Sequence, residues 1–179
     1  MTHRGPRFLV LLFVLLGPTY IQAQGLELID FNIEDQFDRS HRHTEYCDKI
    51  VVIVGSDKDG SEFNQLWTSA IHESLKNNPN YNRIVFLPVA DVRGVPFFLK
   101  GFVKGKFPQN KNSWVLLDWD GHFAKAYRFQ SKSSNIVIFA ADGKLLHSAY
   151  GRDVDGATLA EIITTLRVVL NDPSLANQQ

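Results

Sequence analysis

The 179-residue sequence contains a single cysteine, Cys47, which excludes a disulfide within the chain. Three roles remain open for this residue: a buried thiol, a thiol that links two chains into a dimer, or a reactive group. Free cysteines are among the most buried residue types. We therefore expect Cys47 to be buried, and a Cys47-linked dimer stays open as an alternative.

The sequence also lacks an excess of charge of either sign, with 19 Lys and Arg residues against 19 Asp and Glu residues. A nucleic-acid-binding domain usually shows a basic patch or a strongly basic balance. Nothing is repeated or of low complexity, and 44% of the residues are hydrophobic, which is enough for a real core. The composition predicts a single globular domain and argues against a nucleic-acid partner.

The apolar run at the start of the chain is too short to cross a bilayer, which takes roughly 20 residues. This run, "FLVLLFVLL", follows the basic "MTHRGPR" and precedes "GPTYIQA", in the order of a secretory signal peptide. We expect cleavage after Ala23 and export to the periplasm or the extracellular space; an uncleaved membrane anchor is the alternative. What remains is one domain over residues 24–172 and a loose tail over residues 173–179.

The hydrophobic period switches repeatedly between strand and helix along this domain. Strands are predicted at 26–33, 49–54, 83–89 and 113–119, two more within 135–151, and helices at 61–75, 96–107, 121–129 and 159–170. Strand–helix alternation favours a parallel sheet with helices on both faces. Asp142-Gly143 is a turn signal, so the last two strands should form an antiparallel hairpin. The predicted fold class is α/β, with a mixed sheet.

Three stretches, in this order, carry a resemblance: "FNIEDQFDRSHRHTEYCDKIVVIV", "WVLLDWDGHFAKAYRF" and "VIFAADGKLLHSAYG". The first has an extended segment, a turn and a lysine before a buried strand. The second has a strand, an Asp-x-x-Gly turn and an A-x-A-Y helix, and the third is a hairpin. Together they resemble the thioredoxin-like fold, and more narrowly its redoxin branch, which includes the alkyl hydroperoxide reductase/thiol-specific antioxidant proteins. The resemblance implies a thioredoxin-like mixed sheet with helices on both faces and a closing antiparallel hairpin.

The sequence departs from this family where the family does its chemistry. A thioredoxin-type enzyme needs a reactive cysteine at the start of the helix after the first buried strand. In this chain that place is held by Asp59, Gly60, Ser61 and Glu62. The family usually has a cis-proline before the closing hairpin, where this chain has Ser133, Ser134 and Asn135. The resemblance therefore implies a degenerate active site without competent thiol chemistry.

Such a protein would serve as a binding or scaffolding module in the cell envelope, with no cofactor. Its partner would be a protein or a small ligand bound at the former redox groove. The competing hypothesis is a divergent thiol antioxidant or reductase that uses Cys47 with an external thiol. Residues 49–55 separate Cys47 from the helix start by more than ~20 Å at about 3.3 Å per residue. Cys47 should therefore lie at the opposite end of the sheet from the usual site.

A metal site is a third hypothesis, because the stretch "HRHTEYC" holds His41, His43 and Cys47. Two imidazoles and a thiolate can converge on a metal ion if the segment is a loop. We favour solvated histidines beside a buried thiol, and expect no metal.

Three motifs, "DKDG", "DWDG" and "DVDG", place two aspartates before a glycine, as calcium loops do. Counting from Asp57, the twelfth position of a calcium loop would be Thr68 instead of the bidentate glutamate. We interpret these motifs as turns in which an aspartate bonds its own backbone. One such turn also explains the closeness of Asp118, Asp120 and His122.

The stretch "FFLKGFVKGKF" combines phenylalanines with lysines at helical spacing. On a helix it forms a broad apolar face rimmed by Lys100 and Lys104. Covering the sheet is the common role of such a face, and we expect it here. A partner surface made by Phe97, Phe98 and Phe102 with these lysines is the alternative, facing either a protein groove or a membrane.

Overall fold

The computed structural model describes residues 26–172. The predicted signal peptide, residues 1–23, and the predicted loose tail, residues 173–179, lie outside the described residues. Within residues 26–172, no helix has both the length and the apolar character needed to cross a membrane.

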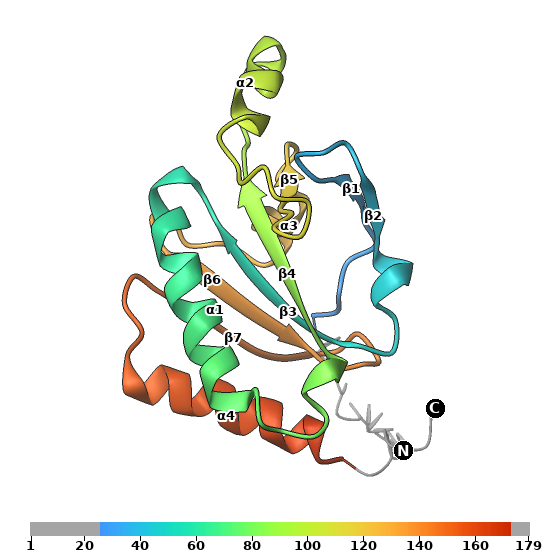
Figure 1. Cartoon of the computed structure of the whole chain (residues 1–179), viewed down its shortest axis with the longest axis vertical. Helices are drawn as coiled ribbons and strands as arrows, with labels where there is room; N and C mark the ends of the chain where they lie inside the picture. Colours follow the sequence, from blue (N-terminus) through green and yellow to red (C-terminus); the bar gives the residue numbers. More distant parts are fainter. Residues whose placement is uncertain (1–25, 173–179) are drawn as a thin grey trace, which may run out of the picture.

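A five-stranded sheet forms the centre of the domain, in the order β5-β4-β3-β6-β7 (Figure 1). Its strands are β3 (Ile50–Ser56), β4 (Ile84–Asp91), β5 (Leu116–Asp118), β6 (Ser134–Phe139) and β7 (Leu145–Gly151). The first three are parallel, whereas β6 runs antiparallel to β3 and β7 antiparallel to β6. The predicted mixed sheet with a closing antiparallel hairpin is confirmed.

The central strand β3 is buried along its whole length. Its β-branched run, "IVVIV", suits a strand that is covered on both faces. Val52 and Val54 face one hydrophobic cluster, and Val51 and Ile53 face the other. The sheet therefore separates two cores, each of which needs its own cover.

Two helices, α1 (Ser61–Leu75) and α4 (Gly156–Leu170), cover one face of the sheet together (Figure 1). Trp67, a residue of α1, is fully buried. Its indole N–H donates to the Gly151 carbonyl at 3.2 Å, which fixes α1 to β7. On the other face, α3 (His122–Ala126) and the N-terminal segment form the cover, with Phe31 and Phe123 at its centre. Helices on both faces are confirmed.

The N-terminal segment contains a hairpin that the sequence did not predict. In place of one strand over residues 26–33, β1 (Asn32–Glu34) pairs antiparallel with β2 (Ser40–Arg42). The fully buried Asp35 organises the turn, because its carboxylate accepts N–H donors from Phe37 at 2.8 Å and from Arg39 at 3.1 Å. Two short 3-10 helices, η1 (His43–Tyr46) and η3 (Tyr81–Arg83), lead into β3 and β4 respectively.

The phenylalanine-rich stretch does not cover the sheet, so that expectation is wrong. It forms η4 (Phe97–Leu99) and α2 (Lys100–Lys104), which project beyond the end of β4 (Figure 1). Phe97 is 82% exposed, Phe98 70% and Phe102 64%. The face of the sheet that these rings could have covered is already filled by Phe31 and Phe123. A five-residue helix with glycine inside it also has little reach back to the core.

Cys47 is exposed, so the expectation of a buried thiol is wrong as well. The residue ends η1, and the preceding Tyr46 takes the buried position there. Tyr46 stacks on Phe31 at 5.8 Å, which leaves Cys47 on the solvent side.

Candidate functional site

Several loops meet where β3, β4 and β5 end and β6 begins. The ligands of open α/β sheets usually bind at the carboxyl ends of the strands. Residues 57–62 follow β3, and Ser133 directly precedes β6. These segments lie against each other at the backbone: a side chain on Gly60 would place its Cβ 2.6 Å from the Ser133 nitrogen. Gly60 therefore makes this close approach possible.

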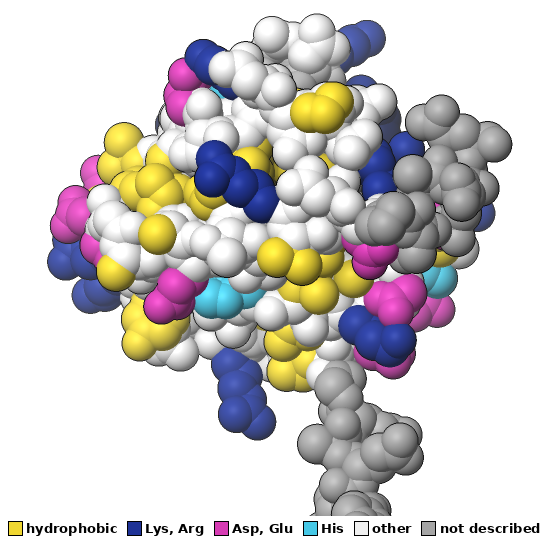
Figure 2. Space-filling model, turned by 90° about the horizontal axis from the view of Figure 1, so that it is seen from below, with side chains coloured by type: hydrophobic (Ala, Val, Ile, Leu, Met, Phe, Trp, Pro, Cys, Tyr) yellow, Lys and Arg dark blue, Asp and Glu magenta, His cyan; other side chains and the backbone are white. Residues whose placement is uncertain are grey.

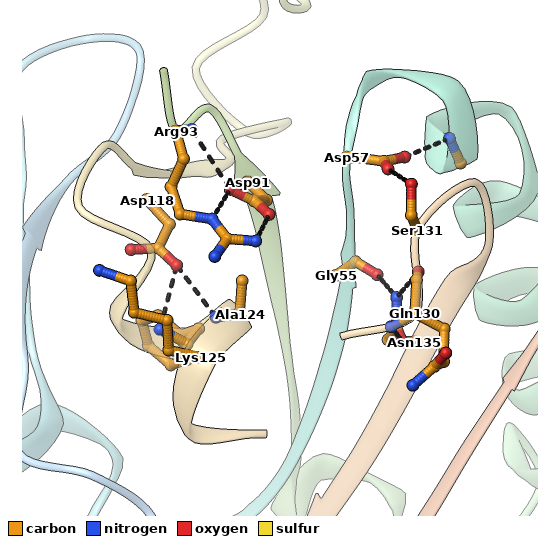
Figure 3. A network of polar contacts seen from close by, with 12 residues as sticks. Gly55, Asp57, Asp91, Arg93, Asp118, Ala124, Lys125, Gln130, Ser131 and Asn135 are labelled. Atoms are coloured by element: carbon orange, nitrogen blue, oxygen red, sulfur yellow. Dashed lines mark hydrogen bonds and ion pairs between the residues drawn. The ribbon is translucent and has the colours of Figure 1, made fainter. Parts of the chain in front are cut away.

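The Asp57 carboxylate joins the two segments (Figure 3). It accepts the Gly60 N–H at 2.9 Å within its own loop, which begins the 3-10 helix η2 (Lys58–Gly60). From the other segment it accepts the Ser131 hydroxyl at 2.5 Å and the Lys132 N–H at 3.0 Å. Burial acts to raise the pKa of Asp57, but these hydrogen bonds outweigh it and hold that pKa below its ordinary value of 3.8. Asp57 is thus a fixed negative charge.

Asn135 fastens the same loop from below. Its buried amide group donates to the carbonyls of Gly55 at 3.1 Å, Gln130 at 3.0 Å and Ser133 at 3.1 Å. Its amide oxygen accepts the Gln130 N–H at 2.6 Å. All of these hydrogen bonds of the Asn135 side chain are made with backbone groups, and Figure 3 shows those with Gly55 and Gln130.

The remaining residues of the two segments divide into an exposed and a buried group. Asp59, Ser61 and Glu62 lie on the surface at the start of α1. Ser134 is fully buried, and within residues 26–172 its hydroxyl has no hydrogen-bond partner. The exposed group is what a partner could touch, whereas Ser134 lies inside the fold.

A second polar group lies at the same end of the sheet, and sequence reasoning missed it (Figure 3). Arg93 pairs with both oxygens of Asp91, at 2.8 Å and 2.6 Å. Its aliphatic stem crosses Gly121 so closely that a Cβ there would lie 2.7 Å from the Arg93 Cγ. Gly121 also has a φ of 70°, which disfavours any other residue.

Asp118 caps α3 from inside the protein. Its carboxylate accepts the N–H groups of His122 at 2.7 Å, Phe123 at 3.0 Å and Ala124 at 3.2 Å. Burial raises the pKa of Asp118 above its ordinary value, against the effect of these hydrogen bonds. An aspartate three residues before the first residue of the predicted helix was the available signal for this cap.

The three Asp-Gly motifs are turns and caps, as interpreted from the sequence. Asp57 binds the Gly60 N–H, Asp118 caps α3, and Asp155 caps α4 by accepting the Thr158 N–H at 2.9 Å. The carboxylates of Asp57, Asp118 and Asp155 are therefore engaged in hydrogen bonds within the fold.

The histidines of the metal hypothesis have other partners. His41 stacks on Trp114 at 4.4 Å and lies within hydrogen-bonding distance of Asp35, at 3.2 Å, and of Tyr46, at 3.0 Å. His43 pairs with Asp30 at 2.5 Å. Residues 26–172 hold no group of three His, Cys, Asp or Glu side chains placed to bind a metal ion. The structure does not bring His41, His43 and Cys47 together as ligands.

Cys47 precedes β3, whereas residues 57–62 follow it, so the thiol lies at the opposite end of the strand. A hollow of about 600 Å³ lies along β7, and it reaches only Gln130 and Asn135 of the loops described above. The exposed surface at the start of α1 instead offers Lys58, Asp59 and Glu62 to solvent. This arrangement can bind through charges and hydrogen bonds, but it holds no thiol for disulfide exchange.

No family model and no curated protein matches the sequence. Solved structures do match. The pneumococcal exposed lipoprotein thioredoxin Etrx1 from Streptococcus pneumoniae is 20% identical with a TM-score of 0.54, and the match covers 76% of this chain and 98% of that one. A putative thiol:disulfide interchange protein DsbE from Chlorobium tepidum is 13% identical with a TM-score of 0.58, covering 82% and 97%. BsSco, of the Sco family of cytochrome c oxidase assembly proteins, is 12% identical with a TM-score of 0.54, covering 82% and 95%. The fold is therefore thioredoxin-like, as the resemblance implied.

Proposed function

We propose that this thioredoxin-like chain is a member of the redoxin branch that has lost thiol chemistry and acts as an exported binding or scaffolding module. One observation carries the proposal. Where such enzymes place a reactive thiol, this chain has Asp59, Gly60, Ser61 and Glu62, and the Asp57 carboxylate just before them holds the turn by accepting hydrogen bonds from Gly60, Ser131 and Lys132. A carboxylate suits a helix start electrostatically but is no substitute for a thiolate nucleophile.

The second part of the usual site has also been replaced. Residues 26–172 contain no cis peptide bond. Asn135 instead holds the 130–133 backbone through three hydrogen bonds and ties it to Gly55 through a fourth. Asp57 and Asn135 both hold the two loops together through hydrogen bonds, which favours a surface kept for binding over an active site in the course of decay.

A protein partner fits this surface better than a small ligand does. Small-molecule sites are concave and mostly apolar. The residues that face solvent at the start of α1 are charged or hydroxylated, and three of them, Asp59, Ser61 and Glu62, belong to one loop and helix turn. Such a patch matches the polar rim of a protein interface.

Export is the remaining part of the proposal. It rests on the signal-like order of residues 1–23 and on the description of a structural neighbour, Etrx1, as an exposed lipoprotein. N-terminal sequencing of the protein from an exporting cell tests it; a chain that begins at Gln24 is expected, and an intact Met1 inside the cell would contradict it.

The loss of thiol chemistry is tested by insulin reduction and peroxide consumption, with Cys47→Ser as the matched control. We expect neither protein to turn over either substrate. Turnover that disappears in Cys47→Ser would overturn the proposal.

Binding is tested by a photo-crosslinking residue at Glu62, with the same residue at Glu73 on the far part of α1 as the control. A partner captured from the envelope at position 62 alone is expected, and equal capture at both positions counts against the site.

A second function, a divergent antioxidant or reductase, is favoured by one observation: Cys47 is exposed and can meet a substrate. A reactive thiol also needs nearby donors that stabilise the thiolate. Within residues 26–172 no hydrogen bond reaches the Cys47 sulfur. The insulin and peroxide assays decide between the two functions. A Cys47-linked dimer would appear as a doubled mass on a non-reducing gel that is absent in Cys47→Ser.

A further inference from the structure

An apolar tip projects from the domain at residues 96–107. Four of its large side chains are exposed, namely Phe97, Phe98, Leu99 and Phe102. Single exposed apolar residues are normal on a soluble protein, whereas four within six positions of one projecting segment are a local concentration of apolar surface. Phe97 and Phe98 pack edge to face at 5.8 Å, so the rings at the end of the tip form a unit.

The tip also lies in a basic part of the sequence. Between Asp91 and Asp118 the sequence has no acidic residue, but it has five basic ones: Arg93, Lys100, Lys104, Lys106 and Lys111. The rest of the chain then has 14 basic residues, 19 less these five, against 19 acidic ones. At the opposite end of the molecule, Figure 2 shows both signs of charge around one face and apolar side chains in separate small groups. The segment that holds the tip is thus basic in sequence, whereas the opposite end of the molecule carries both signs of charge.

Two of these five cations are neutralised within the fold, because Arg93 pairs with Asp91 and Lys104 pairs with Asp38. Two others lie over aromatic rings instead. The Lys100 ammonium is 4.8 Å from the centre of the Trp119 ring, and that of Lys106 is 4.5 Å from the centre of Phe102. A lysine over a ring keeps its charge available for an anion outside the protein.

We propose that the tip is a membrane-docking element for a lipid surface with anionic headgroups. The phenylalanine rings would enter the boundary between headgroups and acyl chains, and Lys100 and Lys106 would face the lipid phosphates. The shape favours a lipid surface over an acidic protein, because a projecting tip needs a matching cavity in a protein but enters a fluid headgroup layer anywhere.

Docking would also orient the molecule. The tip follows the end of β4, at the same end of the sheet as Asp57 (Figure 1). The surface at the start of α1 would then be held near the lipid, where a membrane-bound partner could reach it. The docking inference does not depend on the proposed function, since it rests on residues outside that surface.

The experiment measures partition of the purified exported protein onto phosphatidylcholine vesicles with and without phosphatidylglycerol, at low and high salt. We expect binding to the anionic vesicles and its loss at high salt. Phe97→Ser with Phe98→Ser should weaken the partition coefficient by about tenfold per ring. Lys100→Gln with Lys106→Gln should weaken it by about fivefold per lysine.

Matched controls come from the other end of the molecule. Val168→Ser removes an exposed apolar residue of α4, and Lys76→Gln with Lys144→Gln removes two exposed lysines. Partition should be unchanged in both. Far-ultraviolet circular dichroism should show that all variants are folded, because every altered side chain lies at the surface.

Three results would overturn the inference: no partition onto anionic vesicles at low salt, equal partition onto neutral vesicles, or equal losses in the tip and control variants. The first of these would leave an acidic protein surface as the class of partner that the same charges fit.

Discussion

The Ser131 hydroxyl donates to the Asp57 carboxylate at 2.5 Å across 74 positions of the sequence. This contact closes the loop before β6 onto the loop after β3. It is short and charge-assisted, which is the strong class of hydrogen bond. The surface at the start of α1 is therefore held in one arrangement.

Asp57→Asn should destabilise the protein by about 1–3 kcal/mol. Both carboxylate oxygens of Asp57 accept hydrogen bonds, whereas an asparagine side chain has one accepting oxygen and an NH₂ group that can only donate. Urea unfolding measures this cost. The exposed neighbour provides the control: Asp59→Asn should stay within about 0.5 kcal/mol of the unchanged protein. Equal effects of the two substitutions would mean that the Asp57 hydrogen bonds add nothing to stability.

The contribution of Asp57 should depend on pH in a defined direction. Its pKa is lower in the folded protein than its ordinary value of 3.8, so its stabilisation is complete well above that value. It is lost as the pH falls through the folded pKa. Asp118 acts in the opposite sense: its pKa is raised, so its carboxyl favours folding at low pH, and this benefit is lost as the pH rises through the folded pKa. Carboxyl NMR titration should place the two midpoints on opposite sides of the ordinary value.

Gly60→Ala should destabilise by about 1–3 kcal/mol, because the added methyl group would lie 2.6 Å from the Ser133 nitrogen and force the loops apart. The backbone at Gly60 is right-handed, so the cost is one of space alone. Gly101→Ala in α2 is the matched control, since no atom lies within 4 Å of the added group. There the same change should stabilise by roughly 0.5–1 kcal/mol. Thermal midpoints that move in the same direction would contradict this account.

Asn135→Asp should be among the most damaging single changes, at about 3 kcal/mol or more. It would bring a buried carboxylate against three backbone carbonyl oxygens that now receive N–H donors. Asn112→Asp, at an exposed position, should have little effect in the same urea titration. A tolerated Asn135→Asp would show that the 130–133 loop is held by other contacts.

Asp59→Cys with Glu62→Cys, in a Cys47→Ser background, tests whether the start of α1 is still a competent place for a redox pair. The two positions span one helical turn at a helix start, where a thiolate is stabilised. We expect a disulfide to form under mild oxidation, detected as protection from a thiol probe. Two permanently reactive thiols would show that the geometry, and not only the chemistry, has changed.

Much of the architecture was predictable, because β-branched runs and helical spacing fix β3, β4, α1 and α4 locally. The errors have physical causes. The tip phenylalanines had a helical pattern, but the sequence did not reveal that Phe31 and Phe123 already fill the face they would cover. The hairpin β1–β2 depends on the burial of Asp35, which is a tertiary effect.

The candidate site was predicted in position but not in structure. The two segments that meet were identified through the resemblance, whereas Asp57 was interpreted only as a turn residue. Its contacts with Ser131 and Lys132 depend on where β6 begins relative to β3, and no local pattern encodes that register. The Arg93–Asp91 pair was missed for a similar reason, because its packing over Gly121 links β4 to α3.

The strand order also has a kinetic consequence. The pairing of β3 with β4 joins residues that are close in sequence, such as Val51 and Val85, with only α1 and a short connection between the strands. The pairing of β3 with β6 joins residues that are much farther apart in sequence, such as Val51 and Phe139. Because closing a longer loop costs more entropy, we expect the β3–α1–β4 unit to form first and β6 to be added afterwards. The Asp57–Ser131 contact would then be absent from the folding transition state. Its loss should leave the folding rate unchanged and accelerate unfolding, so this bond would determine how long a folded molecule lasts.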